Sequence, residues 1–169
     1  MRKLVVISVL LCLAFAPISA TAFAQSSDSV EINPLFVDEK TVSTDQELIL
    51  RAGWGACTRG LVRAYITAAH YEWTLDGTPI SLDEETAQYF GPIEAVGPSD
   101  TCVAGNGTLW ASLWRYSIGT LDPGTYEISV HQWLDHPVID GGDYDGDGRM
   151  DRFGDQASEG TVTVTVQEP

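Results

Sequence analysis

The sequence predicts a mostly β fold in which two antiparallel sheets pack face to face as a sandwich. Short runs of alternating apolar and polar residues recur along the chain, most clearly where threonines separate Val162, Val164 and Val166. Gly, Pro, Asn and Asp residues separate these runs at short intervals, as turns between neighbouring strands require. Many short strands joined by turns are typical of a two-sheet sandwich.

The first half of the chain alternates β-like runs with one helical segment. Val30 to Ile32 alternates, and Pro34 interrupts before a second run at 35–37. Glu47 to Arg51 alternates again, with its leucines on one face. From Thr58 to Ala69 the apolar residues fall at helical spacing instead, and Thr58 is a suitable N-cap, so we expect a short helix.

The second half returns to strands. Residues 71–75 form a strand that ends at Asp76-Gly77, a strong hairpin signal. We expect a loop from Ser81 to Asn106, with a helical turn near residues 84–90, because prolines and acids interrupt it. Thr108 to Ser117 and Thr125 to Trp133 are predicted strands, and the valine–threonine run is the last one.

The N-terminus has the features of a secretory signal peptide. Arg2 and Lys3 precede an apolar run from Leu4 to Ala16, and Ala22-Phe23-Ala24 offers the small residues that a signal peptidase needs. The apolar run is shorter than the roughly 20 residues that span a bilayer. We therefore expect residues 1–24 to be a signal peptide and residues 25–169 to be a single β-sandwich domain without a membrane span, secreted or held in the periplasm or at the cell surface of a bacterium.

Charge excludes one class of partner. The chain has nine basic and 24 acidic residues, and removal of Arg2 and Lys3 would change its formal net charge from −15 to −17. Such a surface repels phosphate backbones and anionic membranes and attracts cations, so we do not expect nucleic-acid binding. We expect the partner to be an extracellular protein or a glycan.

Two cysteines remain after the predicted signal peptide. In an oxidising compartment Cys57 and Cys102 are expected to form one disulfide, which would close a loop of 45 residues. The chain-entropy argument assigns about 4 kcal/mol to a loop of that length. The alternative is two separately buried thiols.

Two short motifs resemble an immunoglobulin-like domain. Trp73-Thr74-Leu75-Asp76-Gly77-Thr78-Pro79-Ile80 looks like the C strand and its turn, and Leu121-Asp122-Pro123-Gly124-Thr125-Tyr126 resembles the turn and tyrosine corner that open the F strand. The resemblance covers roughly residues 30–167 and implies that the tyrosine hydroxyl bonds backbone upstream and that Trp73 is the central tryptophan. Neither cysteine falls on the presumed F strand, so the usual inter-sheet disulfide of such domains is absent.

An aspartate-rich stretch before the last strand resembles the front of EF-hand-type and dockerin-type calcium loops. Asp143, Asp145, Asp147 and Asp151 stand at positions 1, 3, 5 and 9, and Gly148 stands at position 6. Calcium prefers six to eight oxygen ligands, and the carbonyl of Arg149 would supply position 7.

The acid usually found at position 12 is missing from this stretch, because Gly154 stands there. Asp155 or Asp140 could substitute for it. The alternative to a metal site is a solvated acidic loop. We expect calcium to order this long connection between the last two strands, and an ion with open sites could also bind a ligand oxygen.

Other groups of residues give weaker evidence for a binding or catalytic site. Trp110, Trp114 and Tyr116 fall on one face of a strand, either as an exposed row for stacking on sugars or as part of the core. His70, His131 and His136 are scattered without a zinc-binding motif. No nucleophile with a recognisable base is present, so we do not expect an enzyme.

The sequence therefore predicts an exported, non-catalytic immunoglobulin-like module for binding or adhesion, stabilised by calcium. A carbohydrate-binding module that uses the aromatic face or the calcium is the main alternative. A secreted enzyme or an enzyme inhibitor is a further one.

Overall fold

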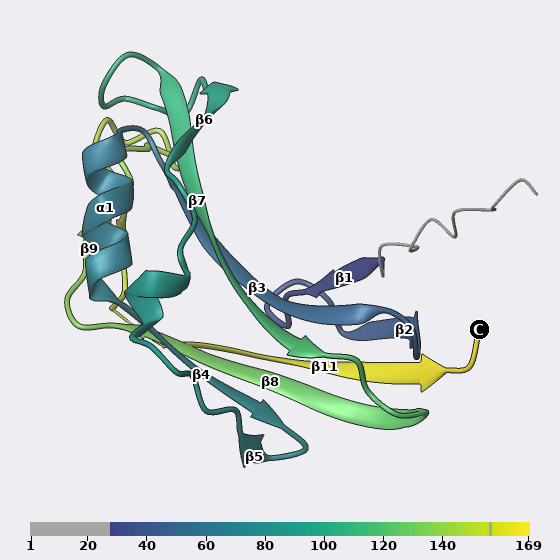
Figure 1. Cartoon of the computed structure of the whole chain (residues 1–169). Coiled ribbons are helices and arrows are strands. Elements are labelled where there is room, and N and C mark those ends of the chain that lie inside the picture. The colour runs from purple at the N-terminus through teal and green to yellow at the C-terminus, as the bar shows by residue number, and fades with distance from the viewer. Residues whose placement is uncertain (1–27, 156) are drawn as a thin grey trace, which may run out of the picture.

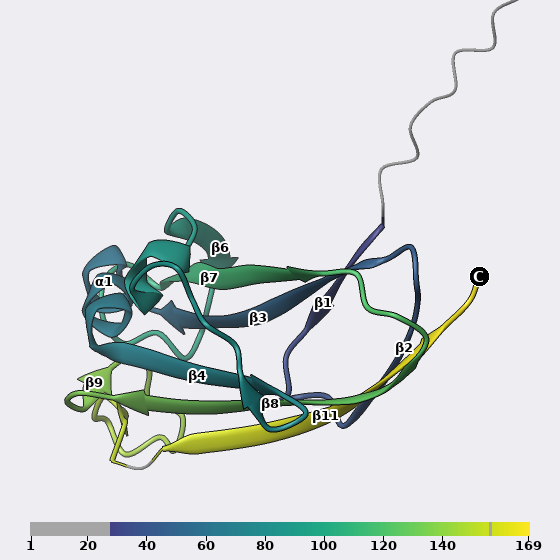
Figure 2. The same ribbon diagram turned by 60° about the horizontal axis from the view of Figure 1, so that its bottom comes forward.

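The computed structural model describes residues 28–155 and 157–169, and the predicted signal peptide lies outside them. Two sheets face each other as layers (Figures 1 and 2), so the predicted mostly β, sandwich-like architecture is confirmed. One sheet has four strands in the order β1 (Ser29–Ile32), β3 (Glu47–Ala56), β7 (Thr108–Gly119) and β6 (Glu94–Pro98). The other has five, in the order β2 (Glu39–Ser43), β11 (Ser158–Gln167), β8 (Gly124–Leu134), β4 (Ala69–Leu75) and β5 (Thr78–Pro79).

The sheets are mixed, which corrects the prediction of purely antiparallel ones. β1 runs parallel to β3, and β2 runs parallel to β11, while the remaining pairs are antiparallel. The segment predicted as a second strand at 35–37 is instead a turn. In it, the Asn33 side chain accepts a hydrogen bond from the Leu35 N–H, and the Asn33 carbonyl accepts one from the Phe36 N–H. This turn sends β1 and β2 to different sheets, because Pro34 cannot donate to a strand ladder.

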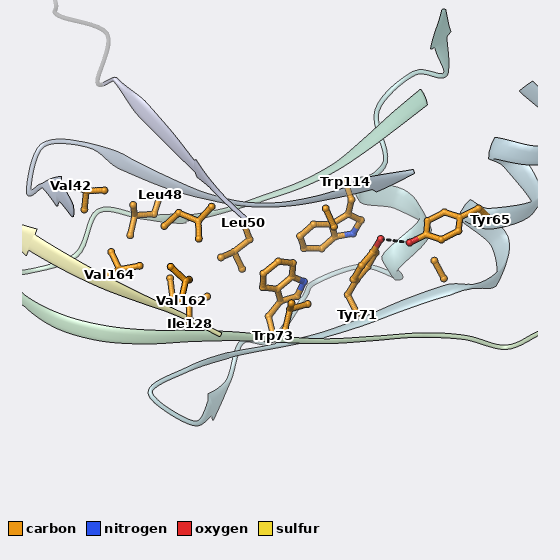
Figure 3. Packing of buried hydrophobic residues seen from close by; sticks show 14 of the residues in the cluster. Val42, Leu48, Leu50, Tyr65, Tyr71, Trp73, Trp114, Ile128, Val162 and Val164 are labelled. Atoms are coloured by element: carbon orange, nitrogen blue, oxygen red, sulfur yellow. Dashed lines mark hydrogen bonds between the residues drawn. The ribbon is translucent and has the colours of Figure 1, made fainter. Parts of the chain in front are cut away.

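The core lies between the two sheets (Figure 3). The indoles of Trp73 on β4 and Trp114 on β7 stack with ring centroids 5.4 Å apart and planes 12° from parallel. Both side chains are almost completely buried, and they belong to the same buried cluster as Leu50, Ile128 and the valines of β11. The prediction that Trp73 belongs to the core is confirmed, and the pair joins one sheet to the other through a large buried apolar area.

The predicted helix is present as α1 (Arg59–Ala68), with Thr58 as its N-cap. The Thr58 hydroxyl accepts a hydrogen bond of 3.2 Å from the Leu61 N–H, which satisfies one of the free donors of the first turn. Val62, Tyr65 and Ala68 form its buried face. α1 closes one end of the sandwich, opposite the C-terminus (Figure 1). None of the helices in the described ranges is long and apolar enough to cross a membrane.

Between β5 and β7 the prediction of a loop is partly wrong. The helical turn appears as the 3₁₀ helix η1 (Thr86–Tyr89), but β6 was not expected. β6 is an edge strand with an irregular register between Ala95 and Gly97, and Pro98 ends it. An edge position tolerates a proline and a bulge because one side of the strand needs no partner.

The two motifs of the predicted resemblance fold as turns. Asp76 and Gly77 both have positive φ, as a two-residue hairpin of this kind requires, and they join β4 to β5. The Tyr126 hydroxyl at the start of β8 donates a hydrogen bond of 3.0 Å to the Asp122 carbonyl. This bond ties the strand to the chain that enters it.

Buried tyrosines should make the protein sensitive to alkali. The hydroxyls of Tyr65 and Tyr71 lie 2.8 Å apart, and the Gln132 side chain donates to Tyr65 at 2.9 Å. Burial raises the pKa of Tyr65 to about 12, and burial together with Tyr65 raises the pKa of Tyr71 further. In the unfolded chain tyrosine ionises near pH 10, so the stability that the neutral phenols contribute is complete below about pH 10 and is lost as the pH rises above it.

We therefore expect the free energy of unfolding to fall between about pH 10 and pH 12, by on the order of 3 kcal/mol from Tyr65 alone. Urea unfolding across this range measures the loss. Tyr71→Phe removes the phenol with the larger shift, so this variant should lose less stability over the same range, even if it starts less stable. If the free energy of unfolding falls equally with pH in the wild type and in Tyr71→Phe, the role given to the buried phenols is wrong.

Candidate metal centre

The predicted disulfide between Cys57 and Cys102 is confirmed, with the two Cα atoms 5.3 Å apart. Cys57 directly follows β3 and is buried, while Cys102 lies in the connection between β6 and β7. The bond therefore fixes the connection before β7 to the segment between β3 and α1, at the end of the sandwich that α1 closes.

Part of the aspartate-rich connection is hydrogen-bonded to the two segments that this disulfide joins. The Cys57 N–H donates to the Asp140 carbonyl, and the N–H groups of Val103 and Ala104 both donate to the Gly141 carbonyl. Cys102 and Gly142 form an isolated antiparallel bridge, and the Asp143 N–H donates to the Thr101 carbonyl at 3.0 Å. The backbone of residues 140–143 is thus bonded on both sides to segments that the disulfide joins.

Gly141 shows how closely these segments approach. It has φ of +83°, and a Cβ placed on it would lie 2.8 Å from the Ala104 Cβ and 3.0 Å from the Cys57 Cβ. Only glycine satisfies both the left-handed backbone and the close contact. The position of the first loop aspartate therefore depends on a glycine that the loop motif itself does not include.

Three of the predicted ligands come together. Asp143, Asp145 and Asp147 each offer a carboxylate oxygen, and these three oxygens lie within 4.8 Å of one another. Two oxygens on opposite sides of a calcium ion are roughly 5 Å apart, so the spacing suits such an ion. No Lys or Arg in the described part of the chain forms an ion pair with these carboxylates, so their mutual repulsion is not relieved by a basic side chain.

Backbone N–H groups hold the three carboxylates in place. The two oxygens of Asp143 accept from Gly146 and Gly148 at 2.8 and 2.9 Å. Asp145 accepts from the Asp147 N–H at 3.1 Å, and Asp147 accepts from the Arg149 N–H at 2.8 Å. Gly148 has φ of +82°, in agreement with the expected sharp turn at position 6.

The other predicted ligands, Asp151 and Asp155, are not part of this triad. The Asp151 carboxylate accepts the Tyr144 N–H at 2.7 Å, so it faces the front of the loop. Asp155 lies 3.7 Å from the Arg152 guanidinium instead. The base of the loop is closed by a small antiparallel pair, β9 (Val138–Ile139) with β10 (Arg152–Phe153), which the sequence did not predict.

The contact between Asp140 and Tyr144, beside the triad in the sequence, was not predicted. Asp140 is a buried carboxylate whose oxygens accept the Gly142 N–H at 2.8 Å and the Tyr144 hydroxyl at 2.7 Å. Burial, and next the bond to Asp140, raise the pKa of Tyr144 to about 12, so its hydroxyl keeps its proton and remains a donor. Asp140 therefore organises the entry to the loop, whereas the sequence analysis considered it only as a substitute for the acid missing at position 12.

The predicted row of aromatics is not a continuous exposed surface. Trp114 is fully buried in the core, so it offers no face to a sugar, and the core alternative is correct for it. Tyr116 is partly buried and packs against the same core. Trp110 lies near the start of β7, where the Arg59 guanidinium stands 4.4 Å above its ring.

The histidines are spread over another surface. The rings of His70 and His131 stack on the two sides of Trp133, with centroids 5.2 and 5.0 Å from it. His70 contacts Asp135 at 2.9 Å, and His131 lies between Glu72 and Glu159 at 3.8 and 4.0 Å. This outer face of the five-stranded sheet is separate from the aspartate loop.

Comparison with known proteins does not show a family for this chain. No protein-family profile matches the chain, and no curated protein matches it. A solved structure similar to the chain is that of the cysteine protease inhibitor EhICP2 from Entamoeba histolytica, with 9% sequence identity and a TM-score of 0.33 over 83% of this chain and 95% of that chain. A likeness this weak carries no argument about function.

Removing the disulfide should weaken both the fold and the loop base. For a separation of 45 residues, the chain-entropy argument gives a loss of about 4 kcal/mol in the free energy of unfolding when Cys57 and Cys102 are both replaced by Ala. Urea unfolding of this double variant measures the loss. Wild-type protein unfolded in the presence of a reductant is the control and should behave in the same way. A loss below about 1 kcal/mol in both would contradict the structural role given to the bond.

Proposed function

We propose that the chain is an exported, non-catalytic immunoglobulin-like module that binds calcium in the loop of residues 143–151 and recognises an extracellular protein or glycan. The observation that carries this proposal is the convergence of Asp143, Asp145 and Asp147, whose oxygens lie within 4.8 Å of one another without a basic partner in the described residues. Calcium neutralises such a cluster and suits its oxygen ligands.

Sheet order supports the immunoglobulin-like part of the proposal. One sheet reads β1-β3-β7-β6 and the other β2-β11-β8-β4-β5, which corresponds to the strand order A-B-E-D and A′-G-F-C-C′ of such domains. The Tyr126 bond to the Asp122 carbonyl and the buried Trp73 on β4 agree with this correspondence. The parallel pairing of β1 with β3 and the helix between β3 and β4 are departures from it.

Export is supported by the predicted signal peptide at residues 1–24 and by the disulfide, since such bonds persist mainly in oxidising compartments. In this assignment calcium is a structural ion. It fixes a polar connection between β8 and β11 that would otherwise lose much conformational entropy on folding.

Calcium should stabilise the purified domain. With the ion at about 100 times its dissociation constant, binding adds about 2.7 kcal/mol to the free energy of unfolding. For a domain of this size that corresponds to a rise in melting temperature on the order of 5–10 °C. Calorimetry in calcium and in a chelator measures the difference. Asp143→Asn and Asp147→Asn should abolish it.

Asp83→Asn is the matched control, because it removes the same charge from an exposed loop residue outside the aspartate loop. This variant should keep the full calcium shift. A melting temperature that does not respond to calcium in the wild type would refute the metal assignment, and an equal response to magnesium would refute its specificity for calcium.

A further inference from the structure

A cleft lies where β3 meets the aspartate-rich connection. Its volume is about 630 Å³, within the range of ligand sites. Gly53, Trp54 and Gly55 of β3 and Leu109 of β7 form one side, and Tyr144 with the segment 151–153 forms the other. Asp140 also lines it. The cleft therefore combines apolar and aromatic walls with acidic groups.

The cleft stays open because β3 has a free edge there. β1 pairs with β3 only as far as Leu50, whereas β7 pairs with β3 as far as Ala56. Residues 51–56 thus have no strand neighbour on the β1 side within the described chain (Figure 2). Gly53 and Gly55 add no side chains to this edge, so the backbone is accessible to an extended segment.

Its acidic groups lack a positive partner. Asp140 is 3% exposed, and its two hydrogen-bond donors, the Gly142 N–H and the Tyr144 hydroxyl, are neutral. Asp151 accepts only a backbone N–H in the described contacts. The one basic group of the cleft, Arg152, stands 3.7 Å from Asp155 outside it. A buried carboxylate costs free energy unless a cation or several donors compensate it.

The aromatic walls complete the pattern. The Trp54 ring stacks on Tyr65 with centroids 4.4 Å apart, and Phe153 meets it edge-on at 5.1 Å. The Trp54 indole nitrogen is buried and has no acceptor among the described residues. Such apolar walls beside a carboxylate suit the apolar stem of a lysine or arginine side chain, whose charged end can reach the acid.

We propose that this cleft receives a lysine or arginine side chain of a partner polypeptide, which lies along the free edge of β3 and places its cation against Asp140. Charge complementarity argues for this occupant, because the chain carries a formal net charge of −15, and a net negative charge attracts cationic partners. A second copy of the chain would bring the same negative charge. The inference deepens the proposed binding function but does not require calcium to bind.

The test uses the smallest probe that represents an arginine residue. Nα-acetyl-arginine methylamide and its citrulline analogue have nearly the same shape but differ in charge. Each is titrated into isotope-labelled protein at low salt, and the amide signals of residues 53–55 and 151–153 are followed by NMR. We expect the arginine probe to bind at least fivefold more tightly than the citrulline probe. Equal affinities would overturn the proposal.

Variants of the cleft separate charge from shape. Asp140→Asn should weaken arginine binding at least fivefold, Arg152→Gln should strengthen it about twofold, and Asp83→Asn should leave it unchanged. Because Asp140→Asn also changes the loop entry, Gly55→Leu is a second variant. A Cβ at Gly55 meets only ordinary contacts of 3.5 Å or more, so the leucine should fill the cleft and reduce binding without unfolding the protein.

The titration is repeated in calcium and in a chelator. If arginine binds in both while calcium leaves the melting temperature unchanged, the calcium assignment fails and the cleft proposal stands. Arginine affinity unchanged in both Asp140→Asn and Gly55→Leu would overturn the cleft proposal, whatever calcium does. Stronger shifts of the same signals by a neutral sugar, methyl α-glucopyranoside, would also overturn it and would favour a glycan.

Discussion

The arrangement of this molecule at the end closed by α1 depends on one constraint, the attachment of residues 140–143 to the segments joined by the Cys57–Cys102 disulfide. A polar connection of this length would have many conformations if only its ends were fixed to β8 and β11. Here residues 140–143 form backbone hydrogen bonds with Cys57, Thr101, Val103 and Ala104, so the backbone is held in place up to the first aspartate of the triad. The disulfide thus positions a loop to which neither cysteine belongs.

This attachment serves both proposed sites. Asp143 begins the aspartate triad, and Asp140, three residues earlier, lines the cleft beside β3. Tyr144 connects them, because its hydroxyl bonds the Asp140 carboxylate and its N–H bonds the Asp151 carboxylate. An ion bound by the triad would therefore also restrict one wall of the cleft. The two-sheet core, joined through the stacked Trp73 and Trp114, supplies the rigid support for this end of the molecule.

Local patterns in the sequence were sufficient for β1, β3, β4, β7, β8 and β11, the helix cap, the hairpin at Asp76-Gly77 and the disulfide, because each depends on neighbouring residues or on the only cysteine pair left after the predicted signal peptide. They were not sufficient for features set by distant contacts. β1 pairs in parallel with β3, and β2 pairs in parallel with β11, because the turn at Asn33 sends the two strands to different sheets. β6 forms because β7 offers it a free edge. Likewise, the aspartate spacing predicted the triad, but Gly141 and Asp140 gained their roles only from contacts with Cys57, Ala104 and Tyr144.

The most direct test of this account is amide hydrogen exchange measured residue by residue, with and without calcium. If the disulfide-joined segments anchor the loop, the amides of Cys57, Val103, Ala104 and Asp143 are protected in both conditions, whereas those of Gly146, Gly148 and Arg149 become protected only when calcium is present. Rapid exchange of the first group without calcium would contradict the account, because the ion and not the disulfide would then hold the loop in place.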